Sequence, residues 1–588
     1  MKRMDGGRIV AECLDKLGVE YYFGYNGHGI WRILEGLLEK PHIKGIQTKH
    51  EFSAVQMADG YFRAKHKVCP VLASVGPGAL NLISAAGNAM LDSSGVLLIP
   101  TAPPTHYLDR SSLEELSVHA GDDVTSVFRP ISKRVWYTLR PDILAWQVRQ
   151  AYKLAGTGRP GPTTVYIPFD ITAHETEIDE AESFPEDKVS TKMGADPVQI
   201  KRATELFLKS KKPLLVAGGG VHLGEAWDEV KAFVEAFDIP LVTSMPGKGV
   251  LEEDHPLCLG PVGRSGWGCS VQATREADLI LAVGCHFCDA NASGWRKGVV
   301  YNFPDTRLIH VNIDQMDIGR NYPADVGIVG DSKIVLAQII ASLKGVWKEN
   351  TDRKSWSQTA RKWKREWIQK VASDMQGEED PVSTSRLAYE VSKAIPKDAN
   401  IVTDTGDIQQ AYEGLTQTLT RNTFFNNAGW AQMGWAASAV MGVKLARPNQ
   451  AAVCICGDGS MIMANYAMAT AVEYHIPVVW VLINNYGQSI ERHGQLANFG
   501  RETWSSFQIE KTGKLYNPDF GKMAEAYGVK AKKIHSSGEI KKAVQEALQA
   551  NEPYLIEVVT DRNSPTYFSP GVTRGYPVRW DKLAYLKQ

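Results

Sequence analysis

The sequence is poor in cysteine, carries almost no net charge and contains no long apolar run. Eight cysteines in 588 residues are too few for a disulfide framework, so we expect free, buried thiols. A net charge of −1 gives no reason to expect nucleic acid or an anionic membrane as a partner. No run of about 18 apolar residues, the length of a membrane helix, occurs, and residues 1–10 lack the apolar core of a signal peptide. These absences favour a cytoplasmic location.

Two common ligand motifs are missing as well. Cys285 and Cys288 form one C-x-x-C, but no second pair lies at zinc spacing, so packing is favoured over a metal or redox role. Gly218-Gly219-Gly220 does not continue as G-x-G-x-x-G, so the usual nicotinamide fingerprint is not present. The length, with 44% hydrophobic and 22% charged residues, predicts a globular enzyme of about three domains.

The sequence does contain a strand–helix–strand pattern with polar residues at both strand ends. Residues 451–456 are predicted to form a buried strand, 461–473 a helix and 477–483 a second strand. Ligands of parallel sheets bind beyond the carboxyl ends of the strands. Here those ends carry Gly457-Asp458-Gly459-Ser460 and Asn484-Asn485. The pattern predicts a metal-bridged diphosphate, although either segment alone is more often a simple turn.

The spacing of these two segments makes the pattern specific. Carboxylate and amide oxygens such as those of Asp458 and Asn485 suit Mg²⁺, with phosphate oxygens completing the octahedron. Twenty-four residues lie between Gly459 and Asn484, a separation that resembles the signature of enzymes dependent on thiamine diphosphate (ThDP). The likeness covers nearly the whole chain and is greatest to the acetohydroxyacid synthase branch. By this resemblance Asp458, the side chain of Asn485 and the carbonyl of Gly487 hold the metal.

Apolar runs alternating with helical periodicity predict an α/β fold of three doubly wound parallel-sheet domains. The resemblance implies a pyrimidine-binding domain over residues 1–185, a central FAD-binding domain over 190–350, and a diphosphate- and Mg-binding domain over 380–560. The polar stretch 182–197 is predicted to be a linker. Residues 561–588 are rich in Pro and Gly and are predicted to be a closing flap or an ordered, passive tail.

Glu51 is the candidate catalytic acid. It follows a predicted strand and begins a predicted helix, where an acidic group ordinarily complements the helix dipole. The segment His50–Ala64, however, resembles the one that carries the activating glutamate of ThDP enzymes. A desolvated Glu51 with a raised pKa would then donate to the pyrimidine ring of the cofactor.

Further cofactor contacts are implied by the same resemblance. Met433, in a predicted helix over 429–446, matches the methionine that wedges the cofactor into a bent shape, although core packing would explain it as well. The other implied ThDP-binding positions are Gly406, Ala431, Gly457, Gly459 and Ser460.

The resemblance also implies FAD, held structurally in the central domain. His286 stands where the family usually has arginine, which weakens one expected contact. The implied FAD positions are Gly263, Arg264, Ser265, Gly284, His286, Asp314 and Asp331.

Several residues depart from the synthase pattern around the expected substrate pocket. Asn26 and His28 replace a proline and a glycine, and His119-Ala120-Gly121 replaces a Phe-Gln-Glu run. These changes indicate that the synthase pocket is lost. A histidine such as His28 can move protons or activate water near neutral pH, although a lone histidine is more often structural. Asn484 would face the same cavity and could orient substrate.

The predicted function is therefore ThDP-dependent hydrolysis of a carbon–carbon bond in a cyclic 1,2-diketone. The resemblance implies cleavage of cyclohexane-1,2-dione to 6-oxohexanoate, which NAD⁺ could oxidise further to adipate, although the sequence shows no NAD site. The alternatives are an acetohydroxyacid synthase-like carboligase, a trihydroxycyclohexane-1,2-dione hydrolase and a flavin oxidoreductase. A catalytically dead binding protein is disfavoured because Glu51, Asp458 and Asn485 are all present. The family places ThDP between two chains, which implies a homodimer or homotetramer.

Overall fold

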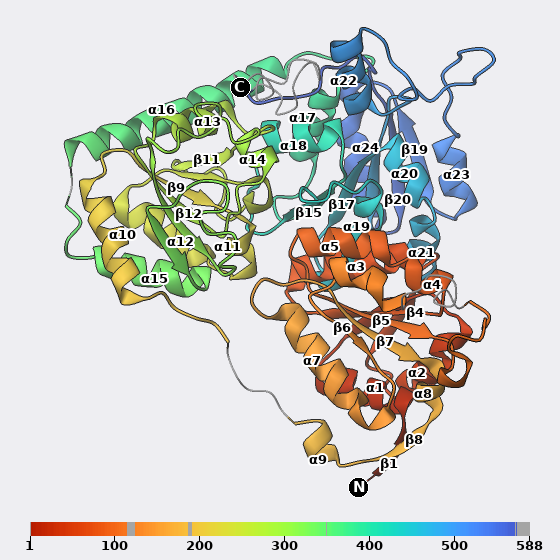
Figure 1. Cartoon of the computed structure of the whole chain (residues 1–588). Helices are drawn as coiled ribbons and strands as arrows, with labels where there is room; N and C mark the ends of the chain where they lie inside the picture. The colour runs from red at the N-terminus through yellow and green to blue at the C-terminus, as the bar shows by residue number, and fades with distance from the viewer. Residues whose placement is uncertain (1, 115–123, 186–190, 349, 571, 573–588) are drawn as a thin grey trace.

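Three six-stranded parallel sheets organise the chain (Figure 1). The computed structural model describes residues 2–114, 124–185, 191–348, 350–570 and 572. Each sheet has helices on both faces, so the predicted α/β fold with three doubly wound domains is confirmed. Within these described residues, no helix is both long enough and apolar enough to cross a membrane.

The first sheet has the strand order β3-β2-β4-β5-β7-β6, and strands before and after it in the chain, β1 and β8, form a separate antiparallel pair. Its inner strands are continuous apolar runs, as expected for a sheet buried on both faces. The elements of this domain are β1 (Lys2–Asp5), α1 (Gly6–Lys16), β2 (Tyr21–Gly24), η1 (His28–Ile30), α2 (Trp31–Leu38), β3 (Lys44–Gln47), α3 (Glu51–Lys65), β4 (Cys69–Ala73), α4 (Pro77–Leu80), α5 (Ile83–Leu91), β5 (Val96–Ala102), β6 (Val135–Tyr137), α7 (Leu144–Gly156), β7 (Thr163–Pro168), α8 (Phe169–Ala173), β8 (Glu175–Ile178) and α9 (Glu180–Ser183).

The central sheet has the order β11-β10-β9-β12-β13-β14 and forms the body on the left of Figure 1. A long helix, α16, lies along it and leads to the third domain. The main elements are α10 (Pro197–Lys209), β9 (Pro213–Ala217), α11 (Gly219–Leu223), α12 (Trp227–Phe237), β10 (Leu241–Thr243), β11 (Cys258–Pro261), α13 (Gly268–Glu276), β12 (Leu279–Val283), α14 (Asp289–Ala292), β13 (Arg307–Asn312), β14 (Val326–Val329), α15 (Ser332–Leu343) and α16 (Thr351–Asp374).

The third sheet has the order β16-β15-β17-β18-β20-β19. Counted in chain order within each domain, the first and third sheets both run 2-1-3-4-6-5, whereas the central sheet runs 3-2-1-4-5-6. The elements of the third domain are α17 (Thr384–Ala394), β15 (Asn400–Thr403), α18 (Asp407–Leu415), β16 (Phe424–Asn426), α19 (Trp435–Ala446), β17 (Ala452–Gly457), α20 (Asp458–Ala464), α21 (Ala467–Glu473), β18 (Val479–Asn484), α22 (Ser489–Phe499), α23 (Phe520–Ala526), β19 (Lys530–Ile534), α24 (Ser537–Ala550) and β20 (Tyr554–Val559).

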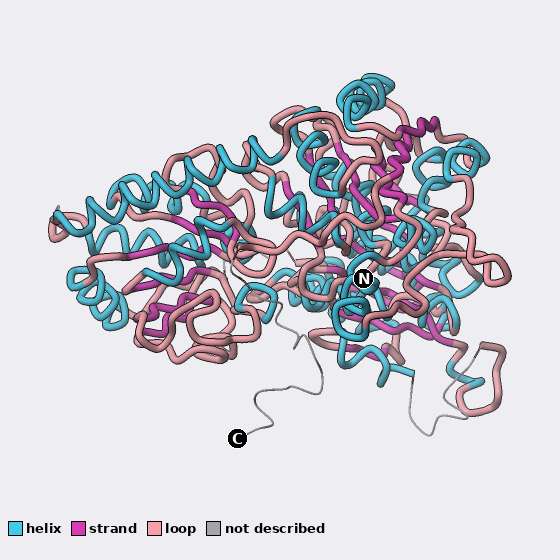
Figure 2. The backbone as a smooth tube through the Cα atoms, turned by 90° about the horizontal axis from the view of Figure 1, so that it is seen from above, coloured by secondary structure: helices cyan, strands magenta, loops and turns pink. Residues whose placement is uncertain are grey.

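The first and third domains share one hydrophobic core, in which α3 packs against α19. Two glycines allow the helix backbones to touch. A Cβ at Gly60 would lie 2.2 Å from the carbonyl oxygen of Ala439, and a Cβ at Gly442 would lie 1.9 Å from that of Met57. Beside this contact, the buried Asp59 accepts hydrogen bonds from Arg63 and from Trp435 of the third domain. Figure 2, seen from above, shows the central domain standing to one side of this pair.

Two predicted helices have different bounds in the structure. The helix expected over 429–446 begins only at Trp435, because Ala431 and Gly434 have positive φ angles of 56° and 81° that no α-helix accepts. The helix expected over 461–473 is two helices, α20 and α21, separated at residues 465–466. Met433 therefore lies in a loop before α19 rather than inside a helix.

The described part of the tail, up to Pro570 and including Val572, crosses from the third domain to the central domain. The Thr566 hydroxyl donates to Asp407 at the start of α18 (2.7 Å). The Ser569 hydroxyl donates to the carbonyl oxygens of Gly263 (2.7 Å) and Gly266 (2.5 Å). This segment thus ties α18 to a loop of the central domain.

Candidate functional site

The predicted metal ligands lie together at the carboxyl ends of β17 and β18. Asp458 is the first residue of α20 and is 1% exposed. Its Oδ1 accepts a hydrogen bond from the backbone N–H of Gly459 (2.8 Å), and its Oδ2 accepts one from that of Gly487 (3.2 Å). Burial raises the pKa of this carboxyl to about 6, which is the expected cost of holding a carboxylate out of water without a counter-charge.

Asn485 presents an unpartnered oxygen beside this carboxylate. Its Nδ2 donates to the Ser489 hydroxyl (2.6 Å), whereas its Oδ1 is buried and has no hydrogen-bond partner. A buried carbonyl oxygen without a donor is costly and fits a cation. In the described parts of the chain no cluster of three His, Cys, Asp or Glu side chains forms a metal site. The oxygens of Asp458 and Asn485 therefore fit Mg²⁺, which takes few protein ligands and fills its shell with phosphate and water.

The glycines predicted to meet the diphosphate face empty space. A Cβ added at Gly406 or Gly457 would meet no atom within 4 Å, so the room above the backbone is open to a ligand. Met433 lies against the same segment, because a Cβ at Gly459 would come within 3.0 Å of the Met433 Cε. The structure thus brings together Gly459 and the predicted wedge methionine.

Other predicted ThDP contacts have different surroundings. The Ser460 hydroxyl donates to Asp404 (3.0 Å), which also accepts the N–H groups of Gly434 and Ala436. Burial raises the pKa of Asp404 to about 7. Ala431 is exposed, and its N–H donates to the carbonyl oxygen of Asn427. The sequence reasoning missed Asp404, whose only signal is an acidic residue directly after β15.

Glu51 is a buried carboxyl at the start of α3, with 7% exposure. The amide of Asn81 donates to its Oε2 (3.0 Å). The ring of the preceding residue, His50, stacks on Tyr466, which lies between α20 and α21 of the third domain, at a centroid distance of 5.6 Å. Glu51 is therefore held at the boundary between the first and third domains.

The predicted substrate residues occupy two different settings. His28 is exposed, with its Nε2 3.8 Å from Glu114 and its ring edge-on to Phe169. Asn484 is buried, and both ends of its amide are occupied: Nδ2 donates to Glu557 (2.7 Å) and Oδ1 accepts from Asn517 (2.7 Å). Both roles stay predictions, and a substrate contact by Asn484 would require exchange of one of these bonds. Residues 119–121 lie outside the described part of the chain.

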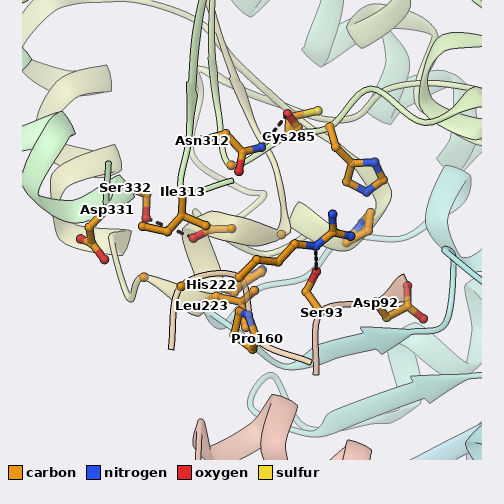
Figure 3. Close-up of a pocket in the computed structure, with 18 of the residues that line it drawn as sticks. Asp92, Ser93, Pro160, His222, Leu223, Cys285, Asn312, Ile313, Asp331 and Ser332 are labelled. Atoms are coloured by element: carbon orange, nitrogen blue, oxygen red, sulfur yellow. Dashed lines mark hydrogen bonds between the residues drawn. The ribbon is translucent and has the colours of Figure 1, made fainter. Parts of the chain in front are cut away.

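A cavity of about 290 Å³ lies where the central domain meets the two others. It sits at the carboxyl ends of β9 and β12, where the strand order of the central sheet reverses, which is the usual ligand crevice of such sheets. Figure 3 shows Asp92, Ser93 and Pro160 of the first domain facing Cys285, Asn312 and Asp331 of the central one. Its size and position fit part of a dinucleotide cofactor such as FAD.

The predicted FAD residues divide into two groups. Gly284, His286 and Asp331 line this cavity, and burial lowers the pKa of His286, so its ring is the neutral form at pH 7. Asp314 approaches Arg159, a lining residue, at 3.6 Å.

The remaining three FAD residues, Gly263, Arg264 and Ser265, are not among the lining residues. Ser265 is fully buried and donates to Glu413 (2.8 Å), and the tail covers its neighbours as described above. The contacts of Ser569 with Gly263 and Gly266 could not be predicted, because they join positions 306 and 303 residues apart. Individual FAD contacts stay predictions.

Comparison with known proteins agrees with this arrangement. The N-terminal TPP binding domain of thiamine pyrophosphate enzymes matches residues 4–122, the central domain 200–339 and the C-terminal TPP binding domain 404–558. A probable acetolactate synthase large subunit of Methanocaldococcus jannaschii is 32% identical over 570 residues, covering 95% of this chain and 92% of that protein. The acetolactate synthase isozyme 3 large subunit of Escherichia coli is 29% identical over 577 residues, covering 96% of each.

These relatives contradict the predicted hydrolysis of a cyclic 1,2-diketone. They are named as acetolactate synthases, which are carboligases, and they match the alternative better. The prediction was wrong because it gave a few pocket residues, His28 and residues 119–121 among them, more weight than a likeness spread over the whole chain. Glu51, Asp458 and Asn485 do not discriminate between the two reactions.

The cofactor prediction, by contrast, agrees with the matched domains, two of which are TPP binding domains. The oxygens of Asp458 and Asn485 fit Mg²⁺, and the cavity at the central domain fits part of FAD. The NAD⁺ site stays a prediction. Three matched domains and a likeness along almost the full length lead to one conclusion: the chain belongs to the family of thiamine diphosphate-dependent enzymes.

Proposed function

We propose that this protein is a carboligase that joins two 2-oxo acids, as an acetolactate synthase does. The observation that carries the proposal is the collinear likeness to acetolactate synthase large subunits over 95% of the chain. In the simplest case two pyruvate molecules give acetolactate and carbon dioxide. Bound ThDP supplies a nucleophilic carbon and accepts the electron pair that decarboxylation releases.

Glu51 is proposed to move and hold the proton that activates the cofactor. Its carboxyl is 7% exposed, and a buried carboxyl positioned against a ring nitrogen can exchange a proton with it. The Asn81 amide, at 3.0 Å from Oε2, keeps the carboxyl in one orientation. This arrangement supports the catalytic role proposed for Glu51.

Asp458 and Asn485 are proposed to hold Mg²⁺ against the diphosphate, with Gly487 as a third ligand. Gly406 and Gly457 leave room for the phosphates, and Met433 lies over Gly459. His28 is proposed to face the substrate from η1, at the edge of the first sheet. FAD is proposed to be structural.

A homo-oligomer, a dimer or a tetramer of this chain, is also proposed. The support is general: in this family the pyrimidine and diphosphate domains that share one ThDP belong to different chains. Analytical ultracentrifugation of the holoenzyme is expected to give a mass of at least two chains.

The function is tested by incubating the purified protein with ThDP, Mg²⁺, FAD and pyruvate, and by identifying products by mass. We expect acetolactate and carbon dioxide in equal amounts, and acetolactate from the E51Q variant at a rate about 10²- to 10⁴-fold lower. A parallel incubation contains cyclohexane-1,2-dione in place of pyruvate. Ring opening there without acetolactate from pyruvate would overturn the proposal, and so would the absence of product in both.

A further inference from the structure

A line of hydrogen-bonded side chains runs from Asp458 to the surface of the third domain. The amide Nδ2 of Asn517 donates to Asp458 Oδ2 (2.8 Å) and to Asn484 Oδ1 (2.7 Å). The amide of Asn484 donates in turn to Glu557 Oε1 (2.7 Å), which also accepts from Lys533 (2.8 Å). Asp458, Asn517 and Asn484 are therefore in direct contact at the predicted metal site.

Asn517 is not part of any helix or strand. It lies in the connection between α22 and α23, directly before Pro518. The neighbouring Tyr516 donates its backbone N–H to Phe507 (3.0 Å), and Gln508 pairs with Leu515 in an isolated antiparallel bridge. Residues 507–516 thus fold back on themselves, and this places the side chain of Asn517 against Asn484 at the carboxyl end of β18.

The amide of Asn517 also carries an unpartnered oxygen. Its Oδ1 is buried without a hydrogen-bond partner, as is the Oδ1 of Asn485. Two unpaired amide oxygens near one buried carboxylate indicate a polar environment that is complete only with a cation present. The two asparagines differ in what the amide Nδ2 contacts. In Asn517 it donates to Asp458 and Asn484, whereas in Asn485 it donates to Ser489.

The donors around Asp458 fix the plane of its carboxylate. Oδ1 is held by the Gly459 N–H, and Oδ2 by the Gly487 N–H and by Asn517. Of these three, only Asn517 is a side chain that substitution can remove. Groups that orient metal ligands in this way typically change metal affinity 10- to 100-fold when they are mutated.

We propose that Asn517 is a positioning residue of the metal site, which orients Asp458 and locks Asn484 beside it. The inference rests on the family's magnesium site and not on the proposed carboligase reaction. Its competing explanation is that Asn517 only fastens the connection between α22 and α23 to the sheet. If Asn517 orients the metal ligand, its removal should lower the affinity for Mg²⁺. If it only fastens the connection, its removal should lower the stability of the metal-free protein.

The test is the N517A variant, stripped of metal and ThDP and then titrated with Mg²⁺ at fixed, saturating ThDP. Binding is followed by tryptophan fluorescence, and the metal-free protein is melted separately. We expect the Mg²⁺ concentration for half-binding to rise about 10- to 100-fold, with the melting temperature of the metal-free protein within about 2 °C of the parent. If N517A does not fold, N517S, whose hydroxyl is too short to reach both partners, is measured instead.

The matched control is N465A. Asn465 lies in the same domain, and its amide also makes two hydrogen bonds, donating to Ile462 and accepting from Tyr527, but it does not contact Asp458. We expect its Mg²⁺ titration to match the parent. An unchanged titration in N517A, or an equal shift in N465A, would overturn the proposal. Product formation is not measured, so failure of the carboligase proposal would leave this result intact.

Discussion

The first and third domains have the same strand order but carry different chemistry at the carboxyl edge of the sheet. In the first domain the edge presents one buried catalytic candidate, Glu51, held by the single amide of Asn81. In the third it presents Asp404 and Asp458, each with several donors. The comparison teaches that the same strand order can present different carboxyl groups, because the segments after each strand decide which donors surround them.

The largest effect that tests this comparison between the two domains is expected at Glu51. We expect E51Q to lower the turnover number about 10²- to 10⁴-fold, the range for loss of a positioned acid or base, while ThDP and Mg²⁺ still bind. Steady-state rates measure the fall in turnover, and a fluorescence titration with ThDP measures whether the cofactor still binds.

The control for Glu51 is E35Q, on the exposed pair of Glu35 with Arg32, which should leave turnover unchanged. If E51Q lost ThDP binding as well as turnover, Glu51 would be needed for cofactor binding. The first and third sheets would then not differ in role as proposed.

The direct contact between α3 and α19 is the next target. G442A should destabilise the protein by about 3 kcal/mol or more, because overpacking against backbone relaxes poorly and the new Cβ would lie 1.9 Å from the Met57 carbonyl oxygen. Urea unfolding measures the effect. In G521A, at a position where the nearest atom would be 3.4 Å away, stability should be almost unchanged. Equal stability of both variants would mean that the two domains do not touch as described.

The attachment of the third domain to the central one should depend on pH through Glu413. Burial raises the pKa of this fully buried carboxyl from the usual 4.5 to about 8. The folded state therefore holds the proton more tightly, so its stabilising effect is present below about pH 4.5 and is lost as the pH rises through about 8.

Between these pH values the free energy of unfolding of the parent should fall relative to E413Q by about 1.4 kcal/mol for each pH unit, since Gln cannot ionise. Chemical denaturation at several pH values measures the difference. E366Q, on the exposed face of α16, should follow the parent. A constant difference between E413Q and the parent across the range would contradict the raised pKa.

The smallest effect is expected at the rim of the contact between the first and third domains. Lys49 of the first domain pairs with Glu473 of the third, with side-chain exposures of 31% and 47%. Exposed pairs contribute about 0.2–1 kcal/mol, so K49A should change stability by no more than that, and less at high salt. A larger loss in urea unfolding would show that the rim, and not the glycine contact, joins the two domains.

Much of the architecture was predictable, because buried strands are short apolar runs that end at polar turns. The runs that became β17 and β18 were predicted as strands, and three parallel-sheet domains were expected. Asp458 and Asn485 were predicted to be metal ligands because the two segments that carry them have a distinctive spacing. Their roles rest on the resemblance, and only mutagenesis tests them.

What could not be predicted depends on contacts between distant residues or on backbone angles. Positive φ angles at Ala431 and Gly434 delay the start of α19 to Trp435, so Met433 lies outside the helix. The amino-acid sequence does not indicate that an alanine adopts this conformation. Ser265 was expected to meet FAD but is buried against Glu413, far along the chain. Asn517 is a single amide in an irregular connection, so neither periodicity nor a motif identifies it.

The tail has a consequence for how the central domain can be released. Because Thr566 and Ser569 clasp α18 and the loop at Gly263 and Gly266, one protease cut after β20 would undo both contacts and leave every strand of all three sheets intact. Limited digestion is therefore expected to weaken the attachment of the central domain to the third domain without altering the strands of either.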